Sequence, residues 1–149
     1  MDTDVTIESL LNLKGHTIWS VTPTATVFEA VQQMAEHNIG SLLVMEGDLL
    51  VGIISERDYA RKIVLHGKNS RSTPVSEILT PVVHRISSRA TIGECMMLMT
   101  DKRIRHLPVV DDGTVVGVIS IGDLVNWIMR TQAATIDQLQ SYIAGGYAA

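Results

Sequence analysis

The sequence predicts an α/β (α+β) protein made of two β-α-β-β-α repeats, packed sheet to sheet about a pseudo-twofold axis and followed by a C-terminal helix. Residues 18–65 align without a gap on residues 83–130 with 13 identities in 48 positions, where about three are expected by chance. The same heptapeptide pattern ends the strands of both copies, as GIISERD at 52–58 and GVISIGD at 117–123. These two observations indicate a tandem duplication.

Each copy begins with a short extended segment, at residues 18–21 and 83–86, and then a helix. Thr26 with Glu29, and Thr91 with Glu94, have the spacing of a capping box, in which each side chain bonds a free N–H of the first turn. In the first of these helices one face carries apolar side chains. Its members are Val27, Val31, Met34 and Ala35.

A β-hairpin and a second helix complete each copy. β-Branched runs at 41–45 and 49–55, and at 106–110 and 114–120, are joined through EGD and DDG, which favour tight turns. The second helices are expected over 56–65 and 121–129. Two sheets of three short strands cannot each bury their apolar face alone, so the copies should pack on each other.

The remaining segments set the predicted boundaries. A short helix at 5–11 precedes the first copy, and Pro74 announces another at 75–79. A last helix at 134–143 is expected to stop at Gly145 and Gly146. We therefore expect a first repeat with its leading helix at 5–65, a linker at 66–74, a second repeat at 75–130 and a helical tail at 131–149.

Composition narrows the function classes. A net charge of −4 argues against nucleic-acid binding, which needs a basic face. No apolar run approaches the roughly 20 residues of a membrane span, and the acidic N-terminus does not resemble a signal peptide, so a cytoplasmic protein is expected. Cys95, the single cysteine, is expected to be a small buried apolar residue. No metal site is expected, because His16, His37, His66 and His84 lack ligand spacing.

The Ser-x-x-Asp step has two compatible interpretations. Ser55 and Ser120 are good N-caps, and Asp58 and Asp123 suit the positive end of a helix. However, both copies keep a glycine three residues before the serine, although glycine weakens a strand. A serine at a helix N-terminus also binds phosphate oxygens, and a carboxylate accepts hydrogen bonds from a vicinal diol. Together these groups suit a ribonucleotide.

The copies resemble a pair of cystathionine-β-synthase-type (CBS) domains, the Bateman module, over roughly residues 5–130. The resemblance rests on the doubled Gly-apolar-x-Ser-x-x-Asp pattern and on RHLPVVD at 105–111. The stretches SERDYARKI, RIRHLPV, SIGDLV and YIAGGY are similar to a subfamily of stand-alone CBS pairs from bacteria and plant organelles. Such modules are regulatory and bind adenosine-containing ligands, including AMP, ADP, ATP, NAD(H) or S-adenosylmethionine.

The resemblance implies two pseudo-symmetric nucleotide sites. In the first, Asp58 would hold the ribose and Ser55 a phosphate, while the opposite copy would bring Ile104 to the base and Arg105 and His106 to the phosphates.

In the second site, Asp123 and Ser120 would take the ribose and phosphate roles, and Ile39 would pack on the base. The positions that match Arg105 and His106 are here Gly40 and Ser41, and Arg57 could compensate. Ile18 and Val83 would line the two adenine slots.

This asymmetry carries two expectations. The Asp58 site should bind phosphorylated ligands more tightly, because it gains two cationic donors. Protonation of His106 near its ordinary pKa of about 6.5 should strengthen phosphate binding as the pH falls.

The expected function is therefore a non-catalytic sensor that binds an adenine nucleotide and modulates an unidentified protein in trans. A ligand-independent interaction scaffold is the alternative, and an enzyme acting on the nucleotide is a third. The resemblance also implies a homodimer formed through the second helices. The apolar residues expected at that interface are Tyr59, Ile63, Val64, Leu124, Trp127, Ile128 and Met129.

Overall fold

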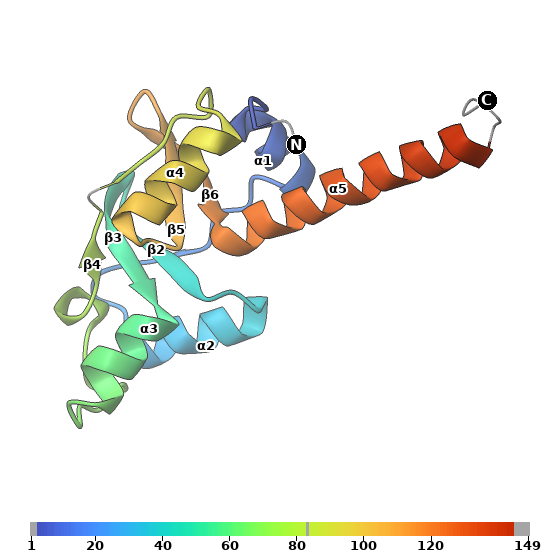
Figure 1. Ribbon diagram of the computed structural model, residues 1–149. Coiled ribbons are helices and arrows are strands. Elements are labelled where there is room, and N and C mark those ends of the chain that lie inside the picture. Colours follow the sequence, from blue (N-terminus) through green and yellow to red (C-terminus); the bar gives the residue numbers. More distant parts are fainter. Residues whose placement is uncertain (1–2, 83, 145–149) are drawn as a thin grey trace. The chain divides into compact units, whose positions relative to one another are not determined.

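Figure 1 shows the computed structural model, which describes residues 3–82 and 84–144. The chain forms two compact units. One consists of Thr17–Arg85 with Asp112–Val115 and is called the Asp58 unit below. The other consists of Met1–His16, Ile86–Asp111 and Val116–Ala149 and is called the Asp123 unit. The predicted packing of the two sheets about a twofold axis concerns the placement of the units and stays a prediction.

The Asp58 unit contains a four-stranded sheet in the order β1-β2-β3-β4. β1 runs parallel to β2, and the other neighbours are antiparallel, with Ser41 opposite Ser55 at the end of the hairpin. Its elements are β1 (Ser20–Val21), α2 (Val27–His37), β2 (Ser41–Glu46), β3 (Leu49–Ser55), α3 (Glu56–Asp58), the π-helix η1 (Tyr59–Val64), the 3-10 helix η2 (Val75–Glu77) and β4 (Thr80–Pro81).

The Asp123 unit repeats the same plan around the hairpin β5-β6. Ile86 forms a parallel bridge to Val109, which corresponds to the β1-β2 pairing of the other unit. Its elements are α1 (Ile7–Lys14), α4 (Ile92–Lys102), β5 (His106–Asp111), β6 (Thr114–Ser120, of which the part from Val116 belongs to this unit) and α5 (Ile121–Ala144). The predicted mixed α/β class and the order of elements within each repeat are confirmed.

Both predicted capping boxes are present. Thr26 and Glu29 exchange hydrogen bonds at the start of α2, and Thr91 and Glu94 do so at the start of α4. The matched helices also end alike, because Asn38 and Arg103 both take the left-handed conformation (φ 53° and 54°). A β-carbon makes that conformation costly for most residues, so its recurrence shows how closely the two copies share a backbone.

The segment that leads into each repeat packs in the other repeat's unit. α1 precedes the first copy along the chain, but the N–H groups of Ile7 and Ile92 donate to the carbonyls of Ala90 and Val5, both at 2.8 Å. Conversely, η2 precedes the second copy, and Val75 donates to the Ala25 carbonyl at 2.8 Å. A one-residue bridge accompanies each contact, at Thr6–Thr91 and Thr26–Pro74. Sequence boundaries at 5–65 and 75–130 therefore do not coincide with the packed units.

These leading segments explain the glycine that precedes each Ser-x-x-Asp step. A β-carbon on Gly52 would lie 2.6 Å from the Thr80 carbonyl oxygen and 2.7 Å from a Leu79 methyl. A β-carbon on Gly117 would lie 2.7 Å from a Leu11 methyl. The strand gives up the packing of a side chain at this position because the leading segment leaves no room for a β-carbon there.

Each unit has its own apolar core. The Asp58 unit buries Val27, Ala30, Met34, Leu42, Val44, Ile54, Ile63, Val75 and Ile78. The Asp123 unit buries Ile7, Leu10, Leu11, Ile86, Ile92, Cys95, Met99, Leu107, Val109, Ile119, Leu124 and Trp127. Burial raises the pKa of the Cys95 thiol to about 11, so this side chain is a packed apolar group as predicted.

Two sequence-based assignments of side chains are wrong. Ala35 is exposed, because the buried stripe of α2 runs through Val27, Ala30 and Met34 instead. Ile63, Leu124 and Trp127 were expected on an intersubunit surface, but they lie in the unit cores. Each second helix packs these large apolar side chains into the core of its own unit, so they are not available for an intersubunit surface.

The second helices of the two repeats differ more than their sequences predict. In the Asp58 unit the helix leaves α-geometry after one turn, and the Leu65 N–H donates five residues back, to Ala60. In the Asp123 unit, α5 continues over 24 residues, so the expected separate tail helix is part of it. Its C-terminal half extends beyond α1 and α4 (Figure 1). The predicted stop at Gly145 and Gly146 lies outside the described residues, within which no helix is long and apolar enough to span a membrane.

Candidate functional site

The Ser-x-x-Asp step of the Asp58 unit is a reciprocal cap. The Asp58 N–H donates to Ser55 Oγ at 3.1 Å. In return, Asp58 Oδ2 accepts the Ser55 N–H at 3.0 Å and the Ser55 hydroxyl at 3.1 Å. Both side chains are thereby fixed where β3 turns into α3. The structural interpretation of this motif is confirmed.

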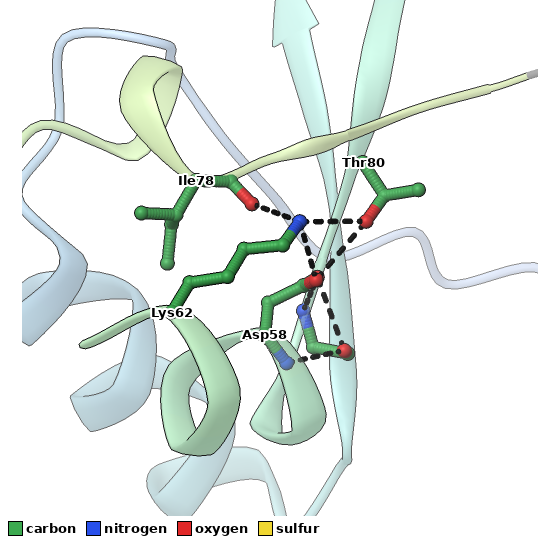
Figure 2. A network of polar contacts seen from close by, with 5 residues as sticks. Asp58, Lys62, Ile78 and Thr80 are labelled. Carbon is green, nitrogen blue, oxygen red and sulfur yellow. Dashed lines mark hydrogen bonds and ion pairs between the residues drawn. The ribbon is translucent and has the colours of Figure 1, made fainter. Parts of the chain in front are cut away.

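Two further side chains hold the second oxygen of Asp58 (Figure 2). Lys62 Nζ lies 3.0 Å from Oδ1, and the Thr80 hydroxyl donates to the same oxygen at 3.0 Å. Lys62 also donates to the Ile78 carbonyl at 2.9 Å and to Thr80 Oγ1 at 3.3 Å. Asp58 itself is only 8% exposed. The network ties the helical turn that carries Lys62 to β4 and to the residue after η2.

The equivalent step in the Asp123 unit is capped in the same way but paired differently. The Asp123 N–H donates to Ser120 Oγ at 3.1 Å, and Asp123 Oδ2 accepts the Ser120 N–H at 2.8 Å. Lys14, from the end of α1, lies 2.7 Å from the same Oδ2 and donates to the Val118 carbonyl at 2.7 Å. A lysine therefore neutralises each motif aspartate, although the two lysines come from unrelated positions in the chain.

Residues 39–41 and residues 104–106, which were expected to face a nucleotide, each lie beside the Ser-x-x-Asp step of their own unit. Gly40 accepts the Glu56 N–H at 3.0 Å, and Arg105 accepts the Ile121 N–H at 2.9 Å, each through its backbone carbonyl. Ile39 and Ile104 pack partly buried against the cores of their units. The structure thus brings residues 39–41 to Ser55 and residues 104–106 to Ser120.

His106 titrates below its ordinary range. Burial lowers its pKa, the Asp123 carboxylate opposes that change, and the Lys14 and Arg105 cations add to it. The expectation that His106 titrates near 6.5 is therefore wrong, because the imidazolium would lose solvation at this position. The groups that influence it show that His106 belongs electrostatically to the Asp123 cluster.

The family of the chain follows from comparison with known proteins. The family model of the CBS domain matches residues 5–65 and 75–130. This chain belongs to the CBS-domain family.

Three relatives illustrate the similarity. The mitochondrial CBS domain-containing protein CBSX3 of Arabidopsis thaliana is 39% identical over 152 residues, which cover 95% of this chain and 73% of the relative. A solved CBS-domain protein from Burkholderia ambifaria has a TM-score of 0.82 and 46% identity, over 86% of this chain and 96% of that one. A CBS-domain protein from Pyrobaculum aerophilum, complexed with AMP, has a TM-score of 0.72 and 25% identity, over 80% and 89% of the two chains.

The other residues predicted for the CBS sites are placed as follows. Arg57 and Arg105 have exposed side chains, and Ile18 is half-buried before β1. Val83 lies outside the described residues. Whether Arg105, His106 and Ile104 face Asp58, and whether residues 39–41 face Asp123, concerns the two units together and stays a prediction.

Sequence reasoning missed three residues of the CBS motifs' surroundings: Lys14, Lys62 and Thr80. Lys62 could have been found, because it lies four residues after Asp58 and (i, i+4) pairs of opposite charge meet on a helix. Lys14 lies 109 residues before Asp123, and Thr80 lies 22 residues after Asp58. Neither contact has a local sequence signal, since both depend on the leading segments.

Proposed function

We propose that this chain is a regulatory CBS pair that binds an adenosine-containing nucleotide and modulates a partner protein in trans. The observation that carries the proposal is the doubled motif, in which a serine hydroxyl and an aspartate are held together at the start of a helix in each unit. A hydroxyl and N–H groups at such a position suit phosphate oxygens, and an aspartate suits a ribose diol.

Two relatives support the choice of ligand and role. The Pyrobaculum protein was solved with AMP, and the description of the Burkholderia protein suggests signal transduction. AMP is therefore the first ligand to test, followed by ADP, ATP and NAD(H). The proposed role is binding and not catalysis, and the regulated protein is to be found by its nucleotide-dependent association with this chain.

The CBS pattern implies ligand-binding residues in both motifs. On the CBS pattern, serines and aspartates at 55, 58, 120 and 123 would face phosphate and ribose, and Ile39, Ile104, Ile18 and Val83 would surround the base; the pairing of Asp58 within its own unit favours Asp123 for the ribose role. Arg57, Arg105 and His106 supply positive charge or hydrogen bonds to phosphate, with Gly40 and Ser41 at the matching positions. The cluster around Asp123 combines Lys14 and His106 with a serine hydroxyl, and this combination suits an anion that carries a ribose.

Isothermal titration with AMP, ATP and NADH tests the proposal. Binding of at least one of them in the micromolar range is expected, together with weaker binding of the 2′,3′-dideoxy analogue of the same nucleotide. Mass spectrometry of the denatured, freshly purified protein would identify any nucleotide that co-purifies. Absence of binding by all three ligands at millimolar concentration would contradict the proposal.

A ligand-independent scaffold is the second candidate. It is favoured by one observation, the complete pairing of Asp58 within the protein itself. Both candidates include a homodimer, for which α5 offers exposed apolar residues at a four-residue spacing: Ile121, Val125 and Met129. A cytoplasmic location is also part of the proposal, although the Arabidopsis relative is by its name mitochondrial.

A further inference from the structure

We propose that the two motif aspartates have different tasks: Asp123 is the ribose acceptor, whereas Asp58 is a structural clasp that holds β4 and the end of η2 against the start of the second helix. Lys62 and Thr80 complete the clasp. The ligand half of this inference rests on the proposed function, but the clasp half does not.

The hydrogen-bonding capacity of Asp58 is used up inside the protein. A carboxylate has about four lone-pair positions. Oδ2 accepts the Ser55 N–H and the Ser55 hydroxyl, and Oδ1 accepts Thr80 and Lys62, at distances of 3.0 to 3.1 Å. The side chain of Asp58 is 10% exposed. A ribose diol could bind here only by displacing existing partners.

Lys62 is saturated as well. Its ammonium group has three N–H donors, and they are directed to Asp58, to the Ile78 carbonyl and to Thr80 Oγ1. Figure 2 shows these contacts converging between the helical turn and β4. Since every donor and acceptor of the cluster has a partner, the cluster is complete without a ligand.

The Asp123 cluster has hydrogen-bonding groups that are without a partner in the described chain. Oδ2 accepts the Ser120 N–H and Lys14, while Oδ1 has no partner among the residues that the structure describes. The side chain of Asp123 is 23% exposed, more than twice the value for Asp58. The Ser120 hydroxyl accepts the Asp123 N–H but, within the described chain, donates to no group. An oxygen for the ribose and a hydroxyl for the phosphate are thus both available.

The duplication explains why the described residues of the Asp123 unit form no matching clasp. The residue that matches Lys62 in the second repeat is Trp127, which is 8% exposed and part of the Asp123 core. The second helix of that unit therefore has no cation at this position. Lys14 neutralises Asp123 instead, from α1, and of the two carboxylate oxygens contacts only Oδ2, so that Oδ1 keeps no partner among the residues described.

Two matched variants test the inference. Lys62→Met removes the cation of the clasp, and Asp123→Asn removes the charge of the proposed ribose acceptor. Lys62→Met should lower the melting temperature by about 3–8 °C and leave AMP affinity within a factor of about two. Asp123→Asn should reduce AMP affinity roughly 10- to 150-fold, the effect of losing a charged hydrogen-bond partner, with a nearly unchanged melting temperature.

Thermal unfolding without ligand and calorimetric titration with AMP provide the two readouts. Wild-type protein should take up a single tight AMP per chain. If Lys62→Met does not fold, Thr80→Val, which removes another partner of Asp58, should lower the melting temperature and leave AMP affinity nearly unchanged. Equal loss of AMP affinity in Asp58→Asn and Asp123→Asn, or a melting temperature unaffected by Lys62→Met and Thr80→Val, would overturn the inference. If the wild type binds no adenine nucleotide, the proposed function fails, and the melting temperatures alone decide whether Asp58 is a clasp.

Discussion

The two Ser-x-x-Asp steps share a reciprocal cap at the start of a helix, yet their aspartates differ in what surrounds them. Asp58 is buried among Ser55, Lys62 and Thr80, whereas Asp123 shares one oxygen with Lys14 and its other oxygen has no partner in the described part of the chain. The duplicated motif therefore forms the same helix cap in both copies, but it does not determine which side chains surround the aspartate. The side chains that decide between clasp and ligand site come from outside the motif.

The largest expected effect concerns the second helix of the Asp123 unit and its exposed apolar residues. In the Asp123 unit, Val125 is 50% exposed between Ile121 and Met129 on α5. If this stripe forms the dimer, Val125→Asp should give a monomer by light scattering, because a buried, unpaired charge is costly. Asn126→Asp adds the same charge at another exposed position of α5 and should leave the mass unchanged. A dimer that persists in Val125→Asp would exclude this stripe.

The two strand glycines test how tightly the leading segments lie on each unit. Gly52→Ala should destabilise the protein by about 1–3 kcal/mol, because the new methyl meets the Thr80 backbone oxygen. Gly117→Ala should cost less, since it meets only the flexible end of Leu11. Urea unfolding of both variants measures the difference. Equal effects would show that β4 can move away from β3 as easily as Leu11 can change rotamer.

The loss of stability on removing each lysine should follow the burial of the aspartate with which it pairs. Lys62→Met is expected to cost about 1–2 kcal/mol, because it leaves a nearly buried carboxylate with one partner fewer and Lys62 itself is 42% exposed. Lys14→Met should cost at most about 1 kcal/mol, the usual value of an ion pair near the surface, because the Asp123 side chain is 23% exposed against 10% for Asp58. Unfolding at high salt should reduce the Lys14 effect more than the Lys62 effect. The reverse ranking would place the clasp at Asp123.

His106 gives the smallest expected effect, and one that the other unit lacks, because Ser41 occupies the matching position. Its pKa is lowered in the folded protein, so the unfolded chain binds the proton more readily. The stability of the wild type relative to His106→Gln should be greatest above the unfolded pKa of about 6.5 and should decline as the pH falls below it. Melting temperatures at pH 7.5 and 5.0 measure this. A wild-type advantage that grows on acidification would mean that the pKa is raised.

The sequence predicted much of the fold for identifiable physical reasons. The duplication, the capping boxes at Thr26 and Thr91 and the hairpins depend on short-range patterns, and all of them are present. The exchange of leading segments could not be predicted, because Ile7 and Val75 carry no mark of the unit in which they are buried.

The same limit applies to the site. Ser55, Asp58, Ser120 and Asp123 were found from their spacing, and Lys62 could have been found from its position four residues after Asp58. Lys14 and Thr80 reach the two aspartates from segments remote in sequence. The expectation that the Asp58 site binds phosphorylated ligands more tightly rested on Arg105 and His106 alone. The closed clasp around Asp58 favours the opposite ranking.

The difference between the two aspartates can be tested most directly by nuclear magnetic resonance of the lysine side chains during a titration with AMP. Lys14 and Lys62 each pair with one motif aspartate, and their εCH₂ resonances can be assigned with Lys14→Arg and Lys62→Arg variants. The assignment of Asp123 as the ribose acceptor predicts that AMP shifts the Lys14 resonance saturably and leaves the Lys62 resonance in place. A saturable shift of Lys62, with Lys14 unchanged, would contradict it.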